Sequence, residues 1–251
     1  MGPRWNASAL ERQAAATKPA TAQPEAGGSQ VPQPSTGQAG GNLPLPAAVA
    51  ATPAMSREAA LDLSPRVLID TPSLMGSISL KGGRIDDLLL RNYRETVKPD
   101  SANISLFSPS GIKGAYYAEF GWTPDPKAAI KTPTSATLWS VKPGAKLTPE
   151  TPVSLEYDNG EGLIFRRTIS IDKDFMFSIA QEVENRTSQA VTLYPYGLIS
   201  RHGTPNIQNF YILHEGLIGV FDEDGLQEIN YDDVIDGNTM TFESTGGWLG
   251  I

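Results

Sequence analysis

Residues 163–183 read LIFRRTISIDKDFMFSIAQEV and alternate in character along most of their length. One face of the first half holds Leu163, Phe165, Arg167, Ile169 and Ile171, and the other holds Arg166, Thr168 and Ser170. After Asp172-Lys173-Asp174, a second shared face holds Phe175, Phe177, Ile179 and Val183. Because side chains alternate between the two faces of a strand, this pattern predicts a long antiparallel hairpin with one buried side.

The sequence on both sides of the hairpin also predicts short strands separated by turns. A turn is predicted at Asn185–Ser188, followed by a strand from Val191 to Ile199 in which Pro195 marks an edge or a bulge. Other short strands are predicted at 66–70, 74–80, 85–93, 116–122, 136–141, 153–157, 217–221, 226–231 and 240–243, with one helical turn at 232–236. Many short strands separated by turn residues indicate an all-β sandwich or barrel.

The N-terminal part, 1–54, has a different composition. From Gln13 to Ala54 it consists mostly of Ala, Pro, Gln, Gly, Ser and Thr, and its only charges are Lys18 and Glu25. Such a segment offers too little apolar surface to offset the entropy of ordering, so we expect a disordered, semi-flexible spacer. Its composition does not distinguish a tether from a dispensable tail.

Composition also excludes several classes of protein. The 251 residues include no cysteine, which excludes a disulfide scaffold, a thiolate zinc site and a cysteine nucleophile. The formal net charge of −8 argues against a nucleic-acid-binding role. No run approaches the ~20 apolar residues of a membrane-spanning helix.

Motifs for catalysis are weak. His202 and His214 are twelve residues apart, so ordinary polar roles are favoured over a zinc site completed by a carboxylate. Two Ser-x-x-Lys matches, Ser110 to Lys113 and Ser170 to Lys173, have no companion motif. The sequence therefore predicts no catalytic residue, no cofactor-binding residue and no metal ligand.

An acidic run, Asp222-Glu223-Asp224-Gly225, invites a calcium-site interpretation. Leu226 and Gln227 occupy places where a calcium loop needs a ligand and a glycine. A hairpin turn between Phe221 and Leu226 is the favoured prediction.

Two groups of aromatic residues allow two interpretations, a binding groove or ordinary packing. Tyr116, Tyr117, Phe120 and Trp122 form one group, and Tyr194 and Tyr196 form the other. Such residues line sugar-binding or peptide-binding grooves, but more often they pack in a core or across strands.

Three blocks of sequence resemble one known family, and they occur in that family's order. They are ISLKGGRIDDLLL at 78–90, EGLIGVF at 215–221 continued by LQEINYDD at 226–233, and STGGWLGI at 244–251. Over Arg66 to Ile251 the chain resembles the periplasmic domain of the YidC family of bacterial membrane protein insertases. The segment before it is similar to the linker that follows the first membrane helix in that family.

The resemblance implies a fold, a role and a location. The fold would be a β-supersandwich of mostly antiparallel strands, galactose-mutarotase-like, over residues 55–251 after the spacer 1–54. The role would be that of a non-enzymatic module without cofactors, in a protein that inserts, folds and assembles inner-membrane proteins, alone or with the Sec translocon. Its partners would be nascent inner-membrane proteins and Sec components, and this part would face the periplasm from the bacterial inner membrane.

The resemblance also predicts that the chain is a fragment. We expect membrane attachment only through segments absent from it, and a domain truncated at its C-terminal end, with loss of stability and of packing around Trp248. An alternative is a mutarotase-like protein that binds or isomerises a sugar. That chemistry requires a general acid and a general base, for which His202 and His214 are the available histidines.

Overall fold

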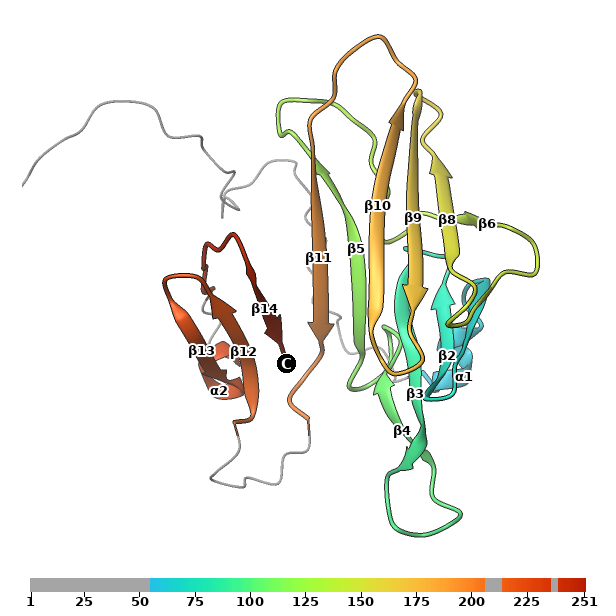
Figure 1. The fold of residues 1–251 in the computed structure, drawn as a ribbon, viewed down its shortest axis with the longest axis vertical. Coiled ribbons are helices and arrows are strands. Elements are labelled where there is room, and N and C mark those ends of the chain that lie inside the picture. Colours follow the sequence, from blue (N-terminus) through green and yellow to red (C-terminus); the bar gives the residue numbers. More distant parts are fainter. Residues whose placement is uncertain (1–54, 206–213, 236–238) are drawn as a thin grey trace, which may run out of the picture. The chain divides into compact units, whose positions relative to one another are not determined.

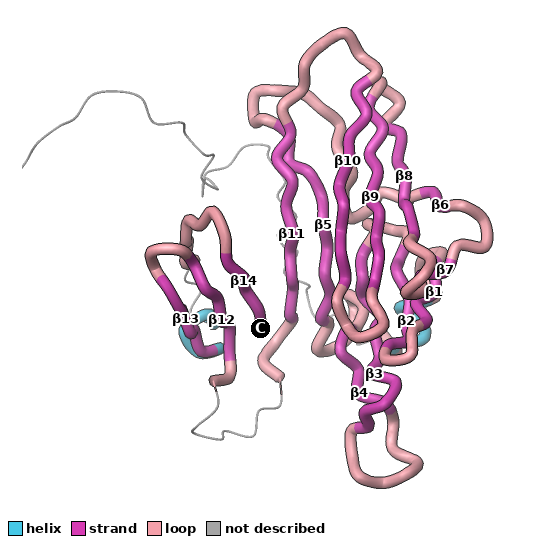
Figure 2. The backbone as a smooth tube through the Cα atoms, viewed as in Figure 1, coloured by secondary structure: helices cyan, strands magenta, loops and turns pink. Residues whose placement is uncertain are grey.

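The computed structural model describes residues 55–205, 214–235 and 239–251 of the chain. The predicted spacer, 1–54, lies outside the described residues. Within these ranges the chain forms fourteen strands and two short helices, shown in Figures 1 and 2. Neither of these helices is long and apolar enough to cross a lipid bilayer.

The largest sheet has seven strands. They are β1 (Arg66–Asp70), β2 (Leu74–Ser79), β3 (Arg84–Arg94), β4 (Asn103–Phe107), β5 (Tyr116–Pro124), β7 (Lys146–Leu147) and β11 (Leu193–Arg201). Their order is β11-β5-β3-β2-β1-β7, with β4 paired to β3. All pairs are antiparallel except β1 with β7. Because β11 ends this order among the described strands, the prediction that Pro195 marks an edge strand is confirmed for this part of the chain.

A second sheet has four strands and contains the predicted hairpin. Its members are β6 (Ser140–Val141), β8 (Val153–Asp158), β9 (Leu163–Ile171) and β10 (Phe177–Asn185), in the order β10-β9-β8-β6. β9 and β10 pair from Ile171 with Phe177 to Leu163 with Asn185. The hairpin prediction is confirmed, including the turn at Asp172–Asp174.

Phe175 corrects one detail of that prediction. It lies in the turn with 48% of its surface exposed, and not on the buried face. The Asp172 carboxylate accepts the backbone N–H groups of Asp174 at 2.9 Å and Met176 at 3.0 Å, so the turn extends to Met176 and strand pairing begins only at Phe177.

The two sheets pack face to face around one apolar core, as the arrangement in Figure 2 shows. The four-stranded sheet contributes Phe165 and Ile169, and the seven-stranded sheet contributes Ile78; all three are 0% exposed. Burying each such side chain stabilises the fold by about 1.5–3 kcal/mol. The all-β sandwich is thus confirmed, whereas the galactose-mutarotase-like type stays a prediction.

A third sheet is formed by the C-terminal strands. They are β12 (Gly216–Phe221), β13 (Gly225–Asn230) and β14 (Gly247–Gly250), in the order β13-β12-β14, and α2 (Tyr231–Ile235) follows β13. Residues 222–224 form the turn between β12 and β13, and Gly225 has a φ of +63°. The predicted hairpin turn and helical turn are both confirmed.

The strand predicted at Met240–Glu243 is wrong. The Phe242 ring stacks on the Phe221 ring, with centroids 4.6 Å apart, and residues 240–243 pair with no strand among the described residues. Asp222 accepts the Thr245 N–H at 2.6 Å, which places Gly247 opposite Phe221. The strand therefore starts at Gly247 and not at Met240.

Other boundaries differ from the sequence prediction near short elements. The strand predicted at 136–141 is limited to Ser140–Val141, because Thr137 closes a turn by donating its N–H to the Thr134 carbonyl at 3.0 Å. Four elements were not predicted: β4, β7, β14 and α1 (Arg57–Leu61). The last begins after Ser56, whose side chain accepts the Ala59 N–H at 3.2 Å.

Candidate functional site

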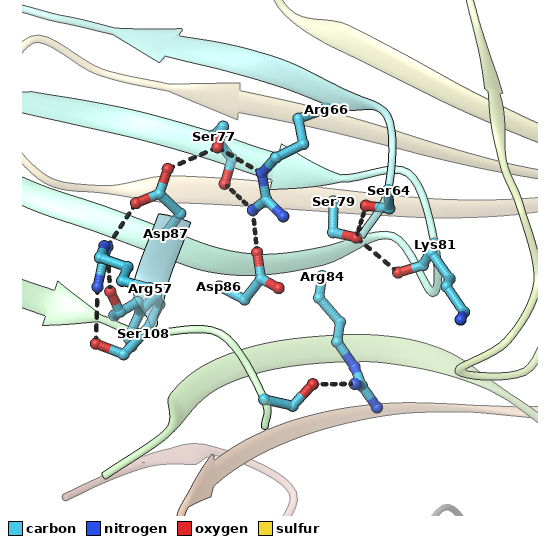
Figure 3. A network of polar contacts seen from close by, with 12 residues as sticks. Arg57, Ser64, Arg66, Ser77, Ser79, Lys81, Arg84, Asp86, Asp87 and Ser108 are labelled. Carbon is cyan, nitrogen blue, oxygen red and sulfur yellow. Dashed lines mark hydrogen bonds and ion pairs between the residues drawn. The ribbon is translucent and has the colours of Figure 1, made fainter. Parts of the chain in front are cut away.

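The outer face of the seven-stranded sheet carries a cluster of charged side chains, part of which Figure 3 shows. On β1, Val67 and Ile69 face the core, so Arg66 lies on the outer face. On β5, Phe120 and Trp122 contact the core, so Glu119 also lies on the outer face. The charged cluster is defined as Arg57, Arg66, Arg84, Asp86, Asp87 and Glu119.

The turn and bulge of the block 78–90 supply half of this cluster. Gly82 and Gly83 have φ values of +77° and +63°, which glycine adopts without strain, and they reverse the chain between β2 and β3. Ser77 pairs with Asp87 and Ile78 with Ile85, so Asp86 is the extra residue of a β-bulge. The bulge lets two consecutive aspartates, Asp86 and Asp87, reach guanidinium groups on the outer side.

Each carboxylate of the cluster has its own guanidinium partner. Arg57 Nη2 lies 2.5 Å from Asp87 Oδ1, and Arg84 Nε lies 2.5 Å from Glu119 Oε2. Arg66 Nη2 pairs with Asp86 Oδ1. The three carboxylate side chains are only 11%, 2% and 7% exposed, respectively. Removing one partner from such a pair leaves a buried charge, so the cluster is costly to disrupt.

Ser77 joins two of the pairs. Its hydroxyl accepts from Arg66 Nε at 2.7 Å and donates to Asp87 Oδ2 at 2.6 Å. Arg66, Asp86, Asp87 and Arg57 therefore form one connected network from β1 through β3 to α1, as Figure 3 shows. These contacts attach elements of the outer face to one another.

Burial changes the acidity of two groups in this region. It raises the pKa of the Asp86 carboxyl, and this effect outweighs the lowering by Arg66. The pKa of the Tyr196 hydroxyl is raised by burial and by the neighbouring Glu119, whose Oε1 accepts its hydrogen bond at 3.2 Å. Tyr196 therefore stays protonated and acts as a donor at neutral pH.

A further buried charge lies on the opposite side of the seven-stranded sheet, in the core. Arg167 is 1% exposed, donates to the Gly83 carbonyl at 2.8 Å and also donates to the Phe120 carbonyl. Burial lowers its pKa to about 10, so the side chain remains charged at neutral pH. Its partners are carbonyl oxygens and aromatic rings, which suits a structural role.

The structure places the two histidines in different settings. The His202 ring centroid lies 5.9 Å from that of Tyr117, and His214 Nε2 lies 2.9 Å from the Leu217 carbonyl. Across the described ranges, no three His, Asp or Glu side chains are grouped as a metal site requires. The absence of catalytic, cofactor and metal residues stays a prediction.

Residues of the other candidate motifs bond neighbouring groups in the fold. Ser110 Oγ accepts from Arg84 at 3.4 Å, and Lys173 Nζ contacts Asp174 at 3.1 Å. In the acidic run, Asp222 accepts from the Thr245 N–H at 2.6 Å and from the Thr245 hydroxyl at 2.8 Å, and these bonds lower the pKa of its carboxyl. The run thus forms a hairpin turn, the favoured alternative.

Two of the six aromatic residues singled out in the sequence are buried. Trp122 is 5% exposed, lies in the core and contacts Phe165 at a centroid distance of 5.2 Å. Tyr117 is 3% exposed, whereas Tyr194 is 40% exposed. The core and cross-strand interpretation therefore holds for Tyr117 and Trp122.

Sequence reasoning missed the charged cluster. One available signal was the pair Asp86-Asp87 within the otherwise apolar run from Ile85 to Leu90. Two adjacent acidic residues cannot both point outward in a regular strand, so they indicate a bulge with cationic partners. Which arginines supply those partners is not visible in the sequence.

Comparison with known proteins yields one family. A family model described as the YidC periplasmic domain matches residues 66–251. A relative from Bradyrhizobium diazoefficiens is 52% identical over 228 residues, which cover 91% of this chain and 35% of the relative. A relative from Methylorubrum extorquens is 47% identical over 259 residues, which cover 98% of this chain and 41% of the relative.

A third relative, from Beijerinckia indica, is 54% identical over 198 residues, or 78% of this chain and 33% of the relative. All three are named membrane protein insertase YidC. The chain therefore spans only about a third to two fifths of the length of these relatives. The alternative of a mutarotase-like sugar protein finds no support in these matches.

Proposed function

This chain belongs to the YidC periplasmic domain family, and from that premise we propose that it is the periplasmic part of a membrane protein insertase. The observation that carries the proposal is the family match over 66–251, supported by about 50% identity to relatives named as insertases. The complete protein would insert and help to fold inner-membrane proteins, alone or with the Sec translocon. The domain would comprise residues 55–251, after a spacer at 1–54.

The proposed role of the domain is non-enzymatic. The three carboxylates of the charged cluster are paired with guanidinium groups, and such pairs hold elements together. Nascent inner-membrane proteins and Sec components are the proposed partners of the complete protein. The proposed location is the inner membrane, with this domain facing the periplasm.

Orientation is tested by thiol labelling, for which the absence of native cysteine from the chain is an advantage. Val97→Cys is introduced at a site that is 103% exposed, in the complete insertase produced in bacteria whose own gene is depleted. Any cysteines in the rest of the complete insertase are replaced first. A membrane-impermeant maleimide is expected to label Val97→Cys in cells with a permeabilised outer membrane and an intact inner membrane.

Ile78→Cys, at a position that is 0% exposed, is the matched control and should react only after denaturation. Labelling of Val97→Cys that requires lysis of the inner membrane would contradict the periplasmic orientation. Function is tested in the same cells, because the complete insertase should restore growth and insertion of a reporter membrane protein. Failure to do so, at normal protein levels, would contradict the insertase role.

A photoreactive amino acid at Tyr194, which is 40% exposed, tests the proposed partners. The expected result is a crosslink to a nascent membrane protein or a Sec component during synthesis of the reporter. The same group at Phe165, which is 0% exposed, is the control and should give none. Equal crosslinking at both positions would show that the products reflect unfolded protein.

A further inference from the structure

The first helix of the described chain is too short to be stable by itself. α1 has five residues, and only Ala60 is buried, at 6% exposure. Isolated helices shorter than ~12 residues are marginal in water, because nucleation costs more than a few hydrogen bonds return. The contacts that α1 makes with the sheet must therefore supply its stability.

One side chain makes most of the polar contacts between α1 and the sheet. Arg57 Nη1 donates to the hydroxyls of Ser105 and Ser108, each at 2.9 Å. Its Nη2 donates to Asp87 Oδ1 at 2.5 Å and to the Phe107 carbonyl at 3.0 Å. The acceptors come from β3, from β4 and from the residue that follows β4, as Figure 3 shows in part.

The acceptor groups are themselves held in place. Asp87 Oδ2 accepts from Ser77 at 2.6 Å, which fixes the carboxylate whose other oxygen receives Arg57. The hydroxyls of Ser105 and Ser108 lie 3.1 Å apart, and Ser105 Oγ lies 3.1 Å from the Phe107 carbonyl oxygen. Oxygen atoms from four residues thus converge on one planar guanidinium, a geometry that suits arginine and not lysine.

We infer that Asp87, Ser105, Ser108 and the Phe107 carbonyl form a binding site for an arginine side chain, occupied within the chain by Arg57. Occupation of this arginine site folds α1 and fixes the point on the outer face at which the preceding residues join the domain. Loss of the contact would release α1 as a local unit and leave the sandwich folded, because the core residues lie on the other face of the sheet. This inference does not depend on the insertase role.

Hydrogen exchange on the full chain tests it. The reporters are the amide of Ala60 in α1 and that of Asp62, which caps the helix; they donate to the Ser56 and Glu58 carbonyls, each at 3.0 Å. In Arg57→Gln, their protection is expected to fall by roughly tenfold or more, because a charge-assisted contact is lost, while the amides of β9 remain far better protected than those of α1. Arg57→Lys should give a similar loss, since one ammonium cannot meet all four acceptors.

Arg91→Gln is the matched control. Arg91 also bonds an aspartate, Asp70 at 2.5 Å, and a carbonyl, that of Thr71 at 3.0 Å, but it lies outside the arginine site. Its substitution should leave α1 protection unchanged. Unchanged α1 protection in Arg57→Gln would overturn the inference. So would equally low protection in α1 and β9, because that result would show that the sandwich opens together with α1.

Energetic coupling between Arg57 and its acceptor Asp87 gives an independent check. Asp87→Asn should release α1 as Arg57→Gln does, and the double variant should show no further loss. If Asp87→Asn does not fold, the Ser105→Ala, Ser108→Ala pair replaces it, because among the described residues these hydroxyls bond only Arg57, each other and the Phe107 carbonyl. Additive losses in the double variant would contradict a shared site.

Discussion

The guanidinium carbon of Arg167 lies 4.8 Å from the centre of the Trp139 ring, in the core between the two sheets of the sandwich. Trp139 is 2% exposed and Arg167 is 1% exposed. A cation over an aromatic ring is attracted by the negative face of the ring, and burial strengthens the attraction. Together with the Gly83 and Phe120 carbonyls, the ring accommodates a charge that has no adjacent carboxylate among its hydrogen-bond partners.

Replacement of this arginine should be costly. Arg167→Met keeps an apolar stem but removes the donor for the Gly83 and Phe120 carbonyls, so we expect a loss of about 2–4 kcal/mol. Arg166→Met, one residue away, is the control: that side chain is 34% exposed and its solvent-screened ion pairs should contribute much less. Urea unfolding measures the loss of unfolding free energy in each variant. Equal losses would show that the buried contacts of Arg167 contribute no more to stability than the exposed ion pairs of Arg166.

A side chain at Gly83 should destabilise the fold more than one at an open glycine. A Cβ there would lie 2.5 Å from Arg167 Nη1, and the residue has a φ of +63°. Gly144 has a similar φ of +75°, but an added Cβ would meet nothing within 4 Å. We expect Gly144→Ala to cost about 1–2 kcal/mol from backbone strain alone, and Gly83→Ala to cost about 2 kcal/mol more from the clash. Thermal midpoints that fall equally would argue against the close approach.

Glu119 should matter more than an exposed glutamate in a comparable ion pair. Glu119→Gln removes the charge that pairs with Arg84, and breaking a buried pair costs about 3–5 kcal/mol. The control is Glu156→Gln, whose side chain is 47% exposed, with an expected cost below about 1 kcal/mol. Chemical denaturation compares the two, and a similar small loss for both would show that the Arg84 pair is effectively solvated.

Asp86 should make the stability of the protein depend on pH in a defined direction. Burial raises the pKa of its carboxyl above 3.8, so the folded state holds this proton more tightly than the unfolded state. Its contribution to stability is therefore fully present below pH 3.8 and is lost as the pH rises through the folded-state pKa. Asp86→Asn cannot titrate and should lack this component.

The measurement is the free energy of unfolding of both proteins from about pH 3 upward. The difference, wild type minus Asp86→Asn, is expected to decrease as the pH rises through this range. Other carboxylates titrate in both proteins and cancel in the difference. A difference that increases with pH would mean that the Arg66 pair outweighs burial.

The sequence by itself determined the class of fold and the hairpin at its centre. Alternation from Leu163 to Ile171 identified one buried face, because the period of a strand is a local property of the chain. Local chemistry also predicted the turn at Asp222–Asp224, since short polar residues before a glycine favour reversal. The blocks that resemble the YidC family indicated membership, which the family match confirmed.

Only the tertiary structure decided which charges meet. Arg57 and Asp87 are 30 residues apart, and Arg84 and Glu119 are 35 apart, so no local pattern pairs them. Phe242 stacks on Phe221 and Gly247 begins the last strand, because the contact between Asp222 and Thr245 sets that register. Periodicity reports which side of a strand is apolar, but partners across a sheet depend on bulges and register, and these arise only when distant strands pair.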